Sequence, residues 1–220
     1  MSTDGFGGYA VVVPIRSLRT AKSRLRISDT MRSDLALAFF LDTIAALERS
    51  TEVERIVVVS RDATIHRHVR DRCNVVADDE TGLPTAVNRG IEKLRRVRHS
   101  GPVAVVLPDL PYSTAGAFDM LLASAREHLR AYLADATGTG TTCVTGASTE
   151  AVIHRFGSNS ARAHTEAGLT ALDIPVPGLR ADVDVLADLR ERKARRIGDA
   201  TSTVLDRWRV LPFTNRQGPG

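Results

Sequence analysis

A basic loop that follows an apolar run is the first place where this chain could do chemistry. Residues 9–13 read YAVVV, typical of a buried strand, and continue into PIRSLRTAKSRL at 14–25. Open α/β sheets bind phosphorylated ligands at the carboxyl ends of their strands. Lysine is rare in this arginine-rich chain, occurring at positions 22, 93 and 193. Because an ammonium is a compact point charge for phosphate, we predict that Lys22 binds phosphate or acts in catalysis.

A carboxylate follows a second apolar run. Residues 103–111 read VAVVLPDLP, so Asp109 stands at the carboxyl end of a central strand, where the prolines stop the strand and fix the turn. Mg²⁺ prefers one or two carboxylates together with substrate phosphates and water. We predict Asp109 as a Mg²⁺ ligand. The alternative is a cap for the helix beginning near Thr114, which a separation of five residues disfavours.

A further pair of acids lies near the end of the chain, in RADVDVLADL at 180–189. Asp182 and Asp184 alternate with apolar residues, so an extended segment would place both carboxylates on one face. Taken alone, they could equally be the N-cap and first-turn acid of a following helix. Beside Asp109, Asp182 would supply the second ligand of a phosphate-bound Mg²⁺ site.

Two loops of small residues could bind anions. Residues 135–142 read DATGTGTT, and residues 155–162 read RFGSNSAR, which places Gly157 before a helix whose first turn would hold Ser160. Free N–H groups and the helix dipole favour anions at such a terminus. An ordinary turn with a helix cap is the alternative for each loop. The first loop is no Walker A motif, because no Gly-Lys-Ser/Thr follows it.

Two other patterns lack the context that their chemistry needs. The glycines in GFGG at 5–8 precede the first strand, whereas a dinucleotide fingerprint follows it. The six histidines show no metal-binding spacing, since His66 and His68 point to different sides of a helix.

The elements that must position these residues alternate along the chain. Short apolar runs separated by segments of helical periodicity indicate an α/β fold with a mainly parallel sheet. We predict strands at 9–13, 55–60, 74–77, 103–107, 131–134, 141–145 and 172–176. We predict helices at 30–48, 63–72, 84–98, 114–129, 159–167 and 186–196, with Ser28 or Asp29 capping the first. Without a Pro-, Gly- or Ser-rich linker, we expect one domain over 1–209 and a mobile tail at 210–220.

Composition points to a cytoplasmic, globular protein. The 220 residues are 43% hydrophobic and 25% charged, and no apolar run approaches the roughly 20 residues of a membrane span. The N-terminus has no signal-peptide pattern, and we expect Cys73 and Cys143 to be reduced thiols. The net charge is +4. Because the charge is not gathered into an arm or an aromatic-rich stripe, an enzyme of polyanionic small molecules explains it as well as nucleic-acid binding does.

Five segments together resemble the guanylyltransferases of coenzyme F-420 biosynthesis, the CofC/FbiD family. They are the loop at 14–25, PDLP at 108–111, DATGTGTT at 135–142, RFGSNSARAH at 155–164 and DVD at 182–184. The resemblance covers residues 10–205. It implies a single-domain nucleotidyltransferase fold (Rossmann-like, glycosyltransferase-A-type), with a mixed, mainly parallel sheet flanked by helices. It also implies transfer of GMP from GTP to a small phosphorylated carboxylic acid, with release of pyrophosphate.

The family resemblance also assigns the residues that would bind the nucleotide. It implies that Arg16, Lys22 and Arg24 bind the nucleotide, with Lys22 neutralising the triphosphate as a catalytic residue. Gly82 and Leu83 correspond to the family's guanine-facing loop, usually Gly-Leu-Asn, which here reads GLP at 82–84.

On the acceptor side, Thr142, Gly157 and Ser160 would bind the phosphate and carboxylate of the acid. Asp109 and Asp182 would hold Mg²⁺, with Asp109 also counted as catalytic. The acceptor is phosphoenolpyruvate, 2-phospho-L-lactate or 3-phosphoglycerate in different members. The arginine-rich composition suggests a GC-rich genome and favours phosphoenolpyruvate.

Other functions predict different features. A molybdenum-cofactor or sugar-phosphate nucleotidyltransferase should carry a G-G-x-S/G-x-R-x-G loop after the first strand, where this chain has PIRSLRTAKSRL. A nucleic-acid-binding protein should show steeply salt-dependent affinity. A non-catalytic relative should lack the metal carboxylates. We expect GTP and the acid as partners, with hand-over of an unstable product to the next transferase and no nucleic acid or membrane partner.

Overall fold

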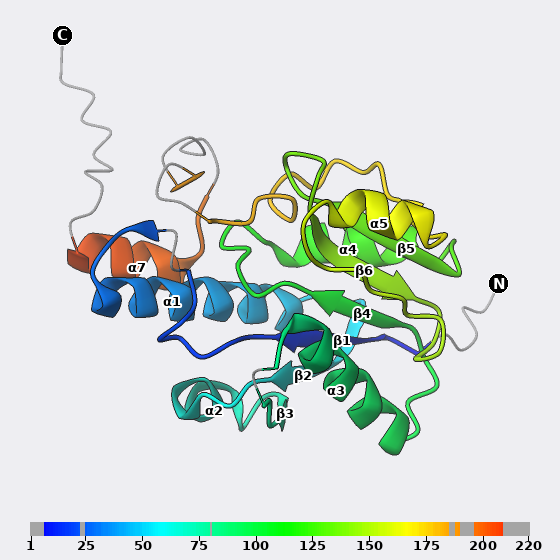
Figure 1. The fold of residues 1–220 in the computed structure, drawn as a ribbon, viewed down its shortest axis with the longest axis horizontal. Coiled ribbons are helices and arrows are strands. Elements are labelled where there is room, and N and C mark those ends of the chain that lie inside the picture. Colours follow the sequence, from blue (N-terminus) through cyan, green and yellow to red (C-terminus); the bar gives the residue numbers. More distant parts are fainter. Residues whose placement is uncertain (1–6, 23–24, 80, 185–187, 190–195, 209–220) are drawn as a thin grey trace, which may run out of the picture.

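A single twisted sheet forms the centre of the computed structural model, which describes residues 7–22, 25–79, 81–184, 188–189 and 196–208. Its seven strands lie in the order β3-β2-β1-β4-β6-β5-β7 (Figure 1). They are β1 Tyr9–Pro14, β2 Val53–Val59, β3 Asn74–Val76, β4 Val103–Val106, β5 Arg130–Ala134, β6 Thr141–Gly146 and β7 Thr170–Ala171. Strand β6 runs antiparallel to β4 and β5, and the other pairs are parallel. The prediction of a mixed, mainly parallel sheet is confirmed.

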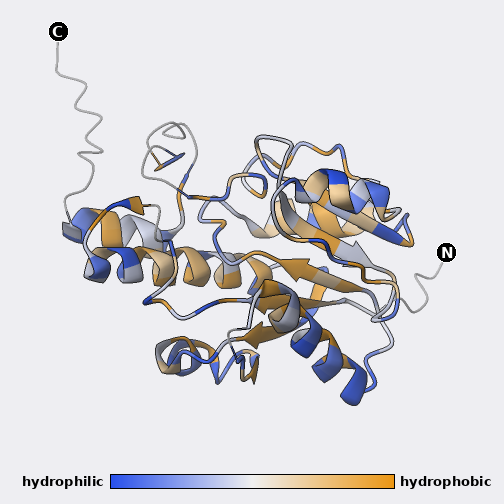
Figure 2. Ribbon diagram, in the orientation of Figure 1, coloured by the Kyte–Doolittle hydropathy of each residue, from blue (hydrophilic) through white to orange (hydrophobic). Residues whose placement is uncertain are grey.

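Helices cover both faces of this sheet. They are α1 Asp29–Glu48, α2 Ala63–Val69, α3 Leu83–Arg96, α4 Ala115–Ala125, α5 Ser160–Glu166 and α7 Asp199–Trp208. Successive side chains of a strand point to opposite faces, and the fully buried β1 shows the consequence. Val11 packs in the core formed with α1, α2 and α4, whereas Val12 packs in the core formed with α3 and α5. Figure 2 shows the apolar colouring concentrated in the strands and the sheet-facing sides of the helices.

The helix starts follow local capping chemistry. The Ser28 hydroxyl accepts a hydrogen bond from Met31 N, so Ser28 rather than Asp29 caps α1. The Thr114 hydroxyl caps α4 by accepting from Ala117 N. Thr114, and not Asp109, therefore does the capping that was the alternative role for that carboxylate. No helix in the described part of the chain is long and apolar enough to span a bilayer.

The C-terminal third departs most from the sequence prediction. The strand predicted at 172–176 is wrong, because the short strand β7 lies at Thr170–Ala171. Pro175 and Pro177 lack the N–H that a ladder needs. Most of the helix predicted at 186–196 and the tail at 210–220 lie outside the described residues.

Helix α7 was not predicted, and a buried acid anchors it against α1. The Asp42 carboxylate accepts hydrogen bonds from Ala200 N (2.9 Å), Thr201 N (2.9 Å) and the Thr201 hydroxyl (2.6 Å). Burial raises the pKa of Asp42 despite these donors. Figure 1 shows α7 lying alongside α1. The anchoring pair is far apart in sequence, so no local pattern could reveal it.

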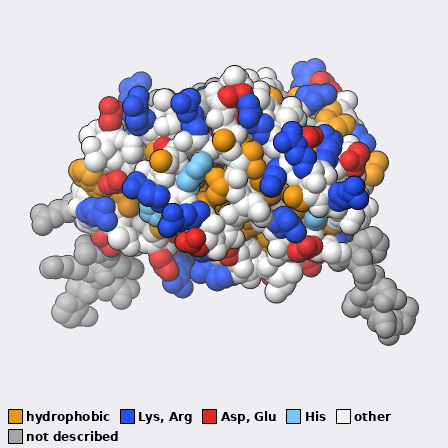
Figure 3. Space-filling model, turned by 90° about the horizontal axis from the view of Figure 1, so that it is seen from below, with side chains coloured by type: hydrophobic (Ala, Val, Ile, Leu, Met, Phe, Trp, Pro, Cys, Tyr) orange, Lys and Arg blue, Asp and Glu red, His pale blue; other side chains and the backbone are white. Residues whose placement is uncertain are grey.

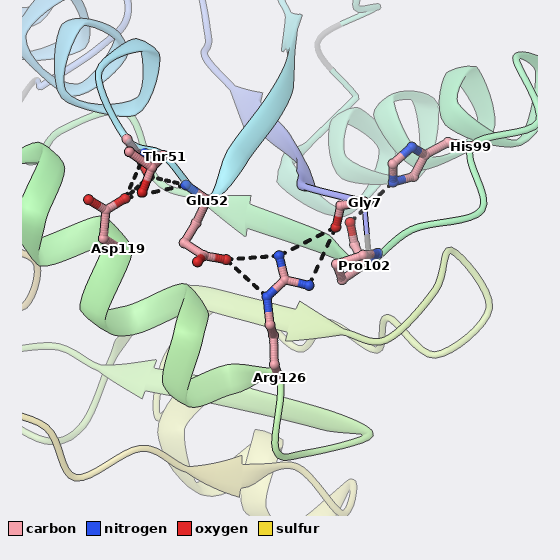
Figure 4. A network of polar contacts seen from close by, with 8 residues as sticks. Gly7, Thr51, Glu52, His99, Pro102, Asp119 and Arg126 are labelled. Carbon is pink, nitrogen blue, oxygen red and sulfur yellow. Dashed lines mark hydrogen bonds and ion pairs between the residues drawn. The ribbon is translucent and has the colours of Figure 1, made fainter. Parts of the chain in front are cut away.

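Ion pairs and hydrogen bonds connect α4 to the amino-terminal ends of β1 and β2 (Figure 4). The Arg126 guanidinium, at the end of α4, pairs with Glu52 (Nη2 to Oε2, 2.8 Å) and reaches Gly7 O. The Asp119 carboxylate accepts from Thr51 N at 2.8 Å and from the Ser50 hydroxyl at 2.6 Å. These contacts fix α4 against the sheet at the edge opposite the strands' carboxyl ends.

Candidate active site

The predicted site residues gather along one edge of the sheet. Strands β1 to β4 are parallel, so their carboxyl ends meet at the same edge, and the antiparallel β6 begins there. The residues that follow these strands, or lie at the start of β6, are Arg16 and Lys22 after β1, Gly82 and Leu83 after β3, Asp109 after β4, and Thr142 in β6.

Three carboxylates meet beside the end of β4. Oxygen atoms of Asp109, Asp182 and Asp184 all lie within 4.8 Å of one another. The chain is pinned there by a hydrogen bond from Val183 N to Asp109 O (3.3 Å). The Lys22 ammonium forms ion pairs with Asp109 and with Asp184, the latter at 3.0 Å. The structure thus joins the basic loop, the PDLP turn and the Asp-Val-Asp segment in one cluster.

Burial and neighbouring charge set the protonation of this cluster. Burial alone would lower the pKa of Lys22, but Asp109 and Asp184 outweigh it and raise that pKa, so the ammonium stays charged. Burial, and next the charges of Asp109 and Asp184, raise the pKa of Asp182 to about 7. The raised pKa of Asp182 thus follows from its burial beside two other carboxylates.

The donor set fits a divalent cation of the hard, oxygen-preferring kind. All three side chains offer carboxylate oxygens, the ligands that Mg²⁺ prefers. The Oδ1 atom of Asp109 is buried and has no hydrogen-bond partner among the described residues. A buried carboxylate oxygen without a partner is costly, and a bound cation would satisfy it. Asp184 was seen in the sequence only as a neighbour of Asp182, and its contact with Lys22 was not predicted.

Several side chains hold the loop that presents Lys22. Asp62, the N-cap of α2, accepts from Leu18 N at 2.9 Å and from the Ser17 hydroxyl at 3.3 Å. The Arg32 guanidinium donates to the carbonyls of residues 19 and 21 at 3.0 and 2.9 Å. Lys22 itself has a φ of 56°, in the left-handed region, a conformation that costs energy for a residue other than glycine. These contacts maintain it and fix the ammonium near the carboxylates.

Hydrogen bonds from α1 hold the turn that carries Asp109. Thr43, which is fully buried, accepts from Leu110 N at 3.2 Å, and its hydroxyl lies 3.2 Å from Pro108 O. Contacts on both sides of Asp109 thus fix its backbone. No sequence pattern marked Thr43, because it lies in an apolar helix far from the turn along the chain.

The loop at 135–142 is largely organised by its own first residue. The Asp135 carboxylate accepts from Thr137 N (3.0 Å), the Thr137 hydroxyl (2.9 Å) and Thr139 N (3.1 Å). A side chain at Gly140 would collide with this carboxylate, 2.3 Å from a built Cβ. The loop is therefore a tight turn between β5 and β6. The Thr142 hydroxyl, just beyond it, is buried and has no partner among the described residues.

The second small-residue loop leads into α5. Gly157 has a φ of 146° with open space where a Cβ would lie, and Ser160 is buried at the first position of the helix. Ala161 N donates to Thr139 O at 3.1 Å, so the two small-residue loops lie against each other. Among the described residues, no hydrogen bond joins Gly157 or Ser160 to the carboxylate cluster.

A buried histidine ties this second loop to the sheet. His164 Nδ1 lies 3.0 Å from the Thr141 hydroxyl, and Nε2 accepts from Arg155 N at 2.8 Å. Its ring stacks on Tyr132 and meets the edge of Phe156, with centroids 5.5 Å apart in both cases. Burial lowers the pKa of His164 to about 4. His164 is thus a neutral structural support for the loop that holds Gly157.

This histidine should make the protein sensitive to mild acid. Its pKa is lower in the folded than in the unfolded chain, where about 6.5 is usual, so the unfolded state binds more protons between these values. The contribution of His164 to the free energy of unfolding is fully present above pH 6.5. It falls by about 3 kcal/mol as the pH drops to 4. Urea unfolding at pH 7.5 and 5.0 measures the loss, and His164→Gln should flatten the difference. Equal pH dependence in both proteins would contradict this role.

A recess beside the end of β1 adjoins the nucleotide-side residues. It is lined by Pro14, Ile15, Arg16, Asp78, Gly82, Leu83 and Ala86. Gly82, the residue before α3, has a φ of 137°, which favours glycine. Arg16, Gly82 and Leu83 therefore share one hollow, whereas Arg24 lies outside the described residues.

Charged side chains of both signs are mixed on one face of the molecule (Figure 3). On the face shown in Figure 3, Lys and Arg side chains are interspersed with acidic and apolar ones. A nucleic-acid footprint is normally a basic patch or stripe. On this face the basic side chains are instead interspersed with other types (Figure 3).

Comparison with known proteins identifies close relatives. A family profile described as "Guanylyl transferase CofC like" matches residues 9–170. Phosphoenolpyruvate guanylyltransferase 2 of Rhodococcus jostii (strain RHA1) is 42% identical over 200 residues, covering 91% of each chain. Phosphoenolpyruvate guanylyltransferase of Streptomyces scabiei (strain 87.22) is 36% identical over 208 residues, covering 90% of this chain and 96% of that protein.

The fold also matches a solved structure from a more distant protein. A protein from Desulfovibrio desulfuricans G20, assigned to the nucleotide-diphospho-sugar transferases, superposes with a TM-score of 0.69 at 14% identity. The match covers 93% of this chain and 96% of that one. At this identity the likeness concerns the fold alone, and it confirms the predicted nucleotidyltransferase architecture.

Proposed function

The chain belongs to the CofC-like guanylyl transferase family, and from that premise we propose that it transfers GMP from GTP to phosphoenolpyruvate, releasing pyrophosphate. The observation that carries the proposal is the cluster of Lys22 with Asp109, Asp182 and Asp184 at the carboxyl edge of the sheet. A lysine and carboxylates gathered at the carboxyl edge of an α/β sheet suit phosphoryl chemistry. Family membership disfavours the molybdenum-cofactor, sugar-phosphate and nucleic-acid-binding alternatives.

The reaction needs little from the protein beyond position and charge. A phosphate oxygen of the acceptor attacks the α-phosphorus of GTP and forms a new P–O bond. The bond from the α-phosphorus to the bridging oxygen breaks, and pyrophosphate leaves with the electron pair. The acceptor phosphate is already an anionic nucleophile, so no general base is required. Lys22 stabilises the charge that grows on the leaving pyrophosphate, because its buried ammonium is fixed before the reaction begins.

Asp109 and Asp182 are the proposed Mg²⁺ ligands, with Asp184 beside them. Bound Mg²⁺ supplies Lewis-acid stabilisation of the phosphate oxygens. The Oδ1 of Asp109, which has no hydrogen-bond partner among the described residues, and the raised pKa of Asp182 both support this assignment, since a bound cation would stabilise both carboxylates. Arg16, Gly82 and Leu83 would then receive the nucleoside end of GTP.

Thr142, Gly157 and Ser160 are the proposed acceptor-binding residues. The buried hydroxyl of Thr142, which has no hydrogen-bond partner in the described part of the chain, supports a polar ligand at this place. The open space beside Gly157 lets a ligand approach the backbone closely. Thr142 lies at the start of β6, and Gly157 and Ser160 lie where the chain enters α5. Strand β6 is on the other side of β4 from β1 and the nucleotide recess.

Ser160→Ala should therefore affect acceptor binding more than catalysis. We expect the KM for the acid to rise about tenfold, the effect of losing one hydrogen bond to a charged group, with a smaller change in the KM for GTP. Steady-state kinetics at saturating GTP measures this. An unchanged acceptor KM would place the acid elsewhere, and Ser158→Ala, at an exposed neighbouring serine, is the matched control.

The experiment that tests the proposed function is pyrophosphate release with Mg²⁺. It crosses GTP, ATP and CTP with phosphoenolpyruvate, 2-phospho-L-lactate and 3-phosphoglycerate. The next pathway transferase and its deazaflavin acceptor are added to remove an unstable product. We expect turnover with GTP and phosphoenolpyruvate, for use in coenzyme F-420 synthesis in the cytoplasm. Silence across the grid with folded protein would refute the proposal.

A further inference from the structure

We propose that Asp78 selects guanine over other bases by accepting hydrogen bonds from its N1–H and its 2-amino group. The inference rests on the proposed function and extends it to a residue that neither the motifs nor the relatives single out. Asp78 lines the recess between the end of β1 and the start of α3.

The recess is small and mostly apolar, so it could receive the edge of a base but not the whole ring system. Pro14, Ile15, Leu83 and Ala86 supply apolar walls, and Gly82 adds backbone without a side chain. Flat aromatic bases bind between such surfaces, and a few polar groups fix their orientation. Among the seven lining residues, Asp78 offers the acceptor side chain and Arg16 the cation.

The Asp78 carboxylate makes few contacts with the described residues. Its backbone is fixed by the hydrogen bond from Asp78 N to Ser60 O (3.3 Å). Its Oδ1 accepts from Asp79 N at 2.9 Å, and no other hydrogen bond or ion pair of this carboxylate is seen among the described residues. Asp78 is partly buried, so a base edge placed against it would exclude water from the contact.

The neighbouring acid is arranged differently. The Asp79 carboxylate forms an ion pair with Arg89 and accepts from Thr81 N (3.2 Å) and the Thr81 hydroxyl (2.8 Å). It does not line the recess. Asp79 therefore braces the loop against α3, and of the two described acids in this loop Asp78 is the one that lines the recess.

The loop after β1 connects the recess to the carboxylate cluster, which sets the orientation of a bound nucleotide. Residues 14–16 line the recess, and the same loop continues to Lys22 in the carboxylate cluster. A base in the recess would thus send its triphosphate along the loop toward Lys22 and Asp109. This places the base apart from the reacting phosphorus, so Asp78 should govern binding rather than the chemical step.

The chemistry of the base edge explains the selectivity. Guanine presents two adjacent donors, N1–H and the 2-amino group, and a carboxylate presents two acceptors. Adenine has an acceptor at N1 and no donor at C2, so it would face Asp78 acceptor to acceptor. An asparagine in place of Asp78 offers one acceptor and one donor, which matches the N1–H and 2-oxo group of xanthine instead.

Asp78→Asn tests the inference, with Asp79→Asn as the matched control. For each protein, kcat and KM are measured with GTP, ATP and XTP at saturating phosphoenolpyruvate. In Asp78→Asn we expect the GTP-over-ATP preference in kcat/KM to fall about 10- to 100-fold, the range for one bidentate base contact. XTP should become a better substrate than GTP, and kcat with GTP should stay near the wild-type value. Asp79→Asn should keep the wild-type preference.

Two results would overturn the inference. One is a wild-type GTP-over-ATP preference in Asp78→Asn, and the other is an equal loss in Asp79→Asn. If wild-type protein turns over no nucleotide, the proposed function fails, and direct binding of fluorescent GTP and ATP analogues to the three proteins then decides the inference. Both substitutions remove one surface charge, so thermal melting checks that the variants remain folded.

Discussion

Asp109→Asn is expected to abolish Mg²⁺-dependent turnover, lowering kcat by about a thousandfold or more. Asparagine has the same shape as aspartate, so the turn held by Thr43 should survive. The substitution removes the negative charge from the residue whose buried Oδ1 has no partner among the described residues. Pyrophosphate release at saturating GTP and phosphoenolpyruvate, over a range of Mg²⁺ concentrations, measures the effect.

Two further variants make this test specific. Asp182→Asn should behave as Asp109→Asn does, since both acids belong to the same cluster. Asp173→Asn changes an exposed acid outside the cluster and should retain wild-type activity. Near-normal turnover in Asp109→Asn would remove that residue from the metal site, whatever the other variants do.

Lys22→Met is expected to lower kcat by about 100- to 1,000-fold, comparable to losing one preorganised donor to a developing charge. Methionine keeps much of the apolar length of the side chain and removes the ammonium that pairs with Asp109 and Asp184. The effect should appear mainly in kcat, because the charge that Lys22 stabilises grows as pyrophosphate departs. Single-turnover kinetics with excess enzyme separates this step from product release.

The control for this substitution is Lys93→Met, on α3 in the region of Asn88 and Arg96. It removes the same charge from a residue outside the cluster and should leave kcat unchanged. If Lys22→Met kept the same kcat as Lys93→Met, the Lys22 ammonium would have no part in catalysis. Lys22→Arg should recover part of the loss, since it restores the charge in a different geometry.

The site was easiest to predict from the sequence where reactive side chains directly follow apolar strands. Lys22 and Asp109 follow apolar runs, and the parallel arrangement of β1 and β4 brings them to one edge. The alternation in the Asp-Val-Asp segment indicated that Asp182 and Asp184 share a face. What it could not indicate is that Lys22 lies between two of the three acids, because that depends on how the last third of the chain returns over β4.

The supporting residues escaped prediction for a common physical reason. Asp62, Arg32 and Thr43 act through single hydrogen bonds to backbone groups that lie far away in sequence. Helices and strands leave a periodic signature, whereas such contacts leave none. Helix α7 was missed likewise, since its anchor is Asp42 on α1. The strand expected at 172–176 was wrong, because Pro175 interrupts its apolar residues and has no N–H to donate to a neighbouring strand.

The most direct test of the central claim is to follow each phosphate of GTP with a label. Wild-type protein is incubated with Mg²⁺, phosphoenolpyruvate and either [α-³²P]GTP or [γ-³²P]GTP, and the products are separated by chromatography. We predict that the α-label appears in a new compound joined to the acid, while the γ-label appears only in pyrophosphate. Transfer of the γ-label to the acid, or release of the α-label as free GMP with no joined product, would contradict it.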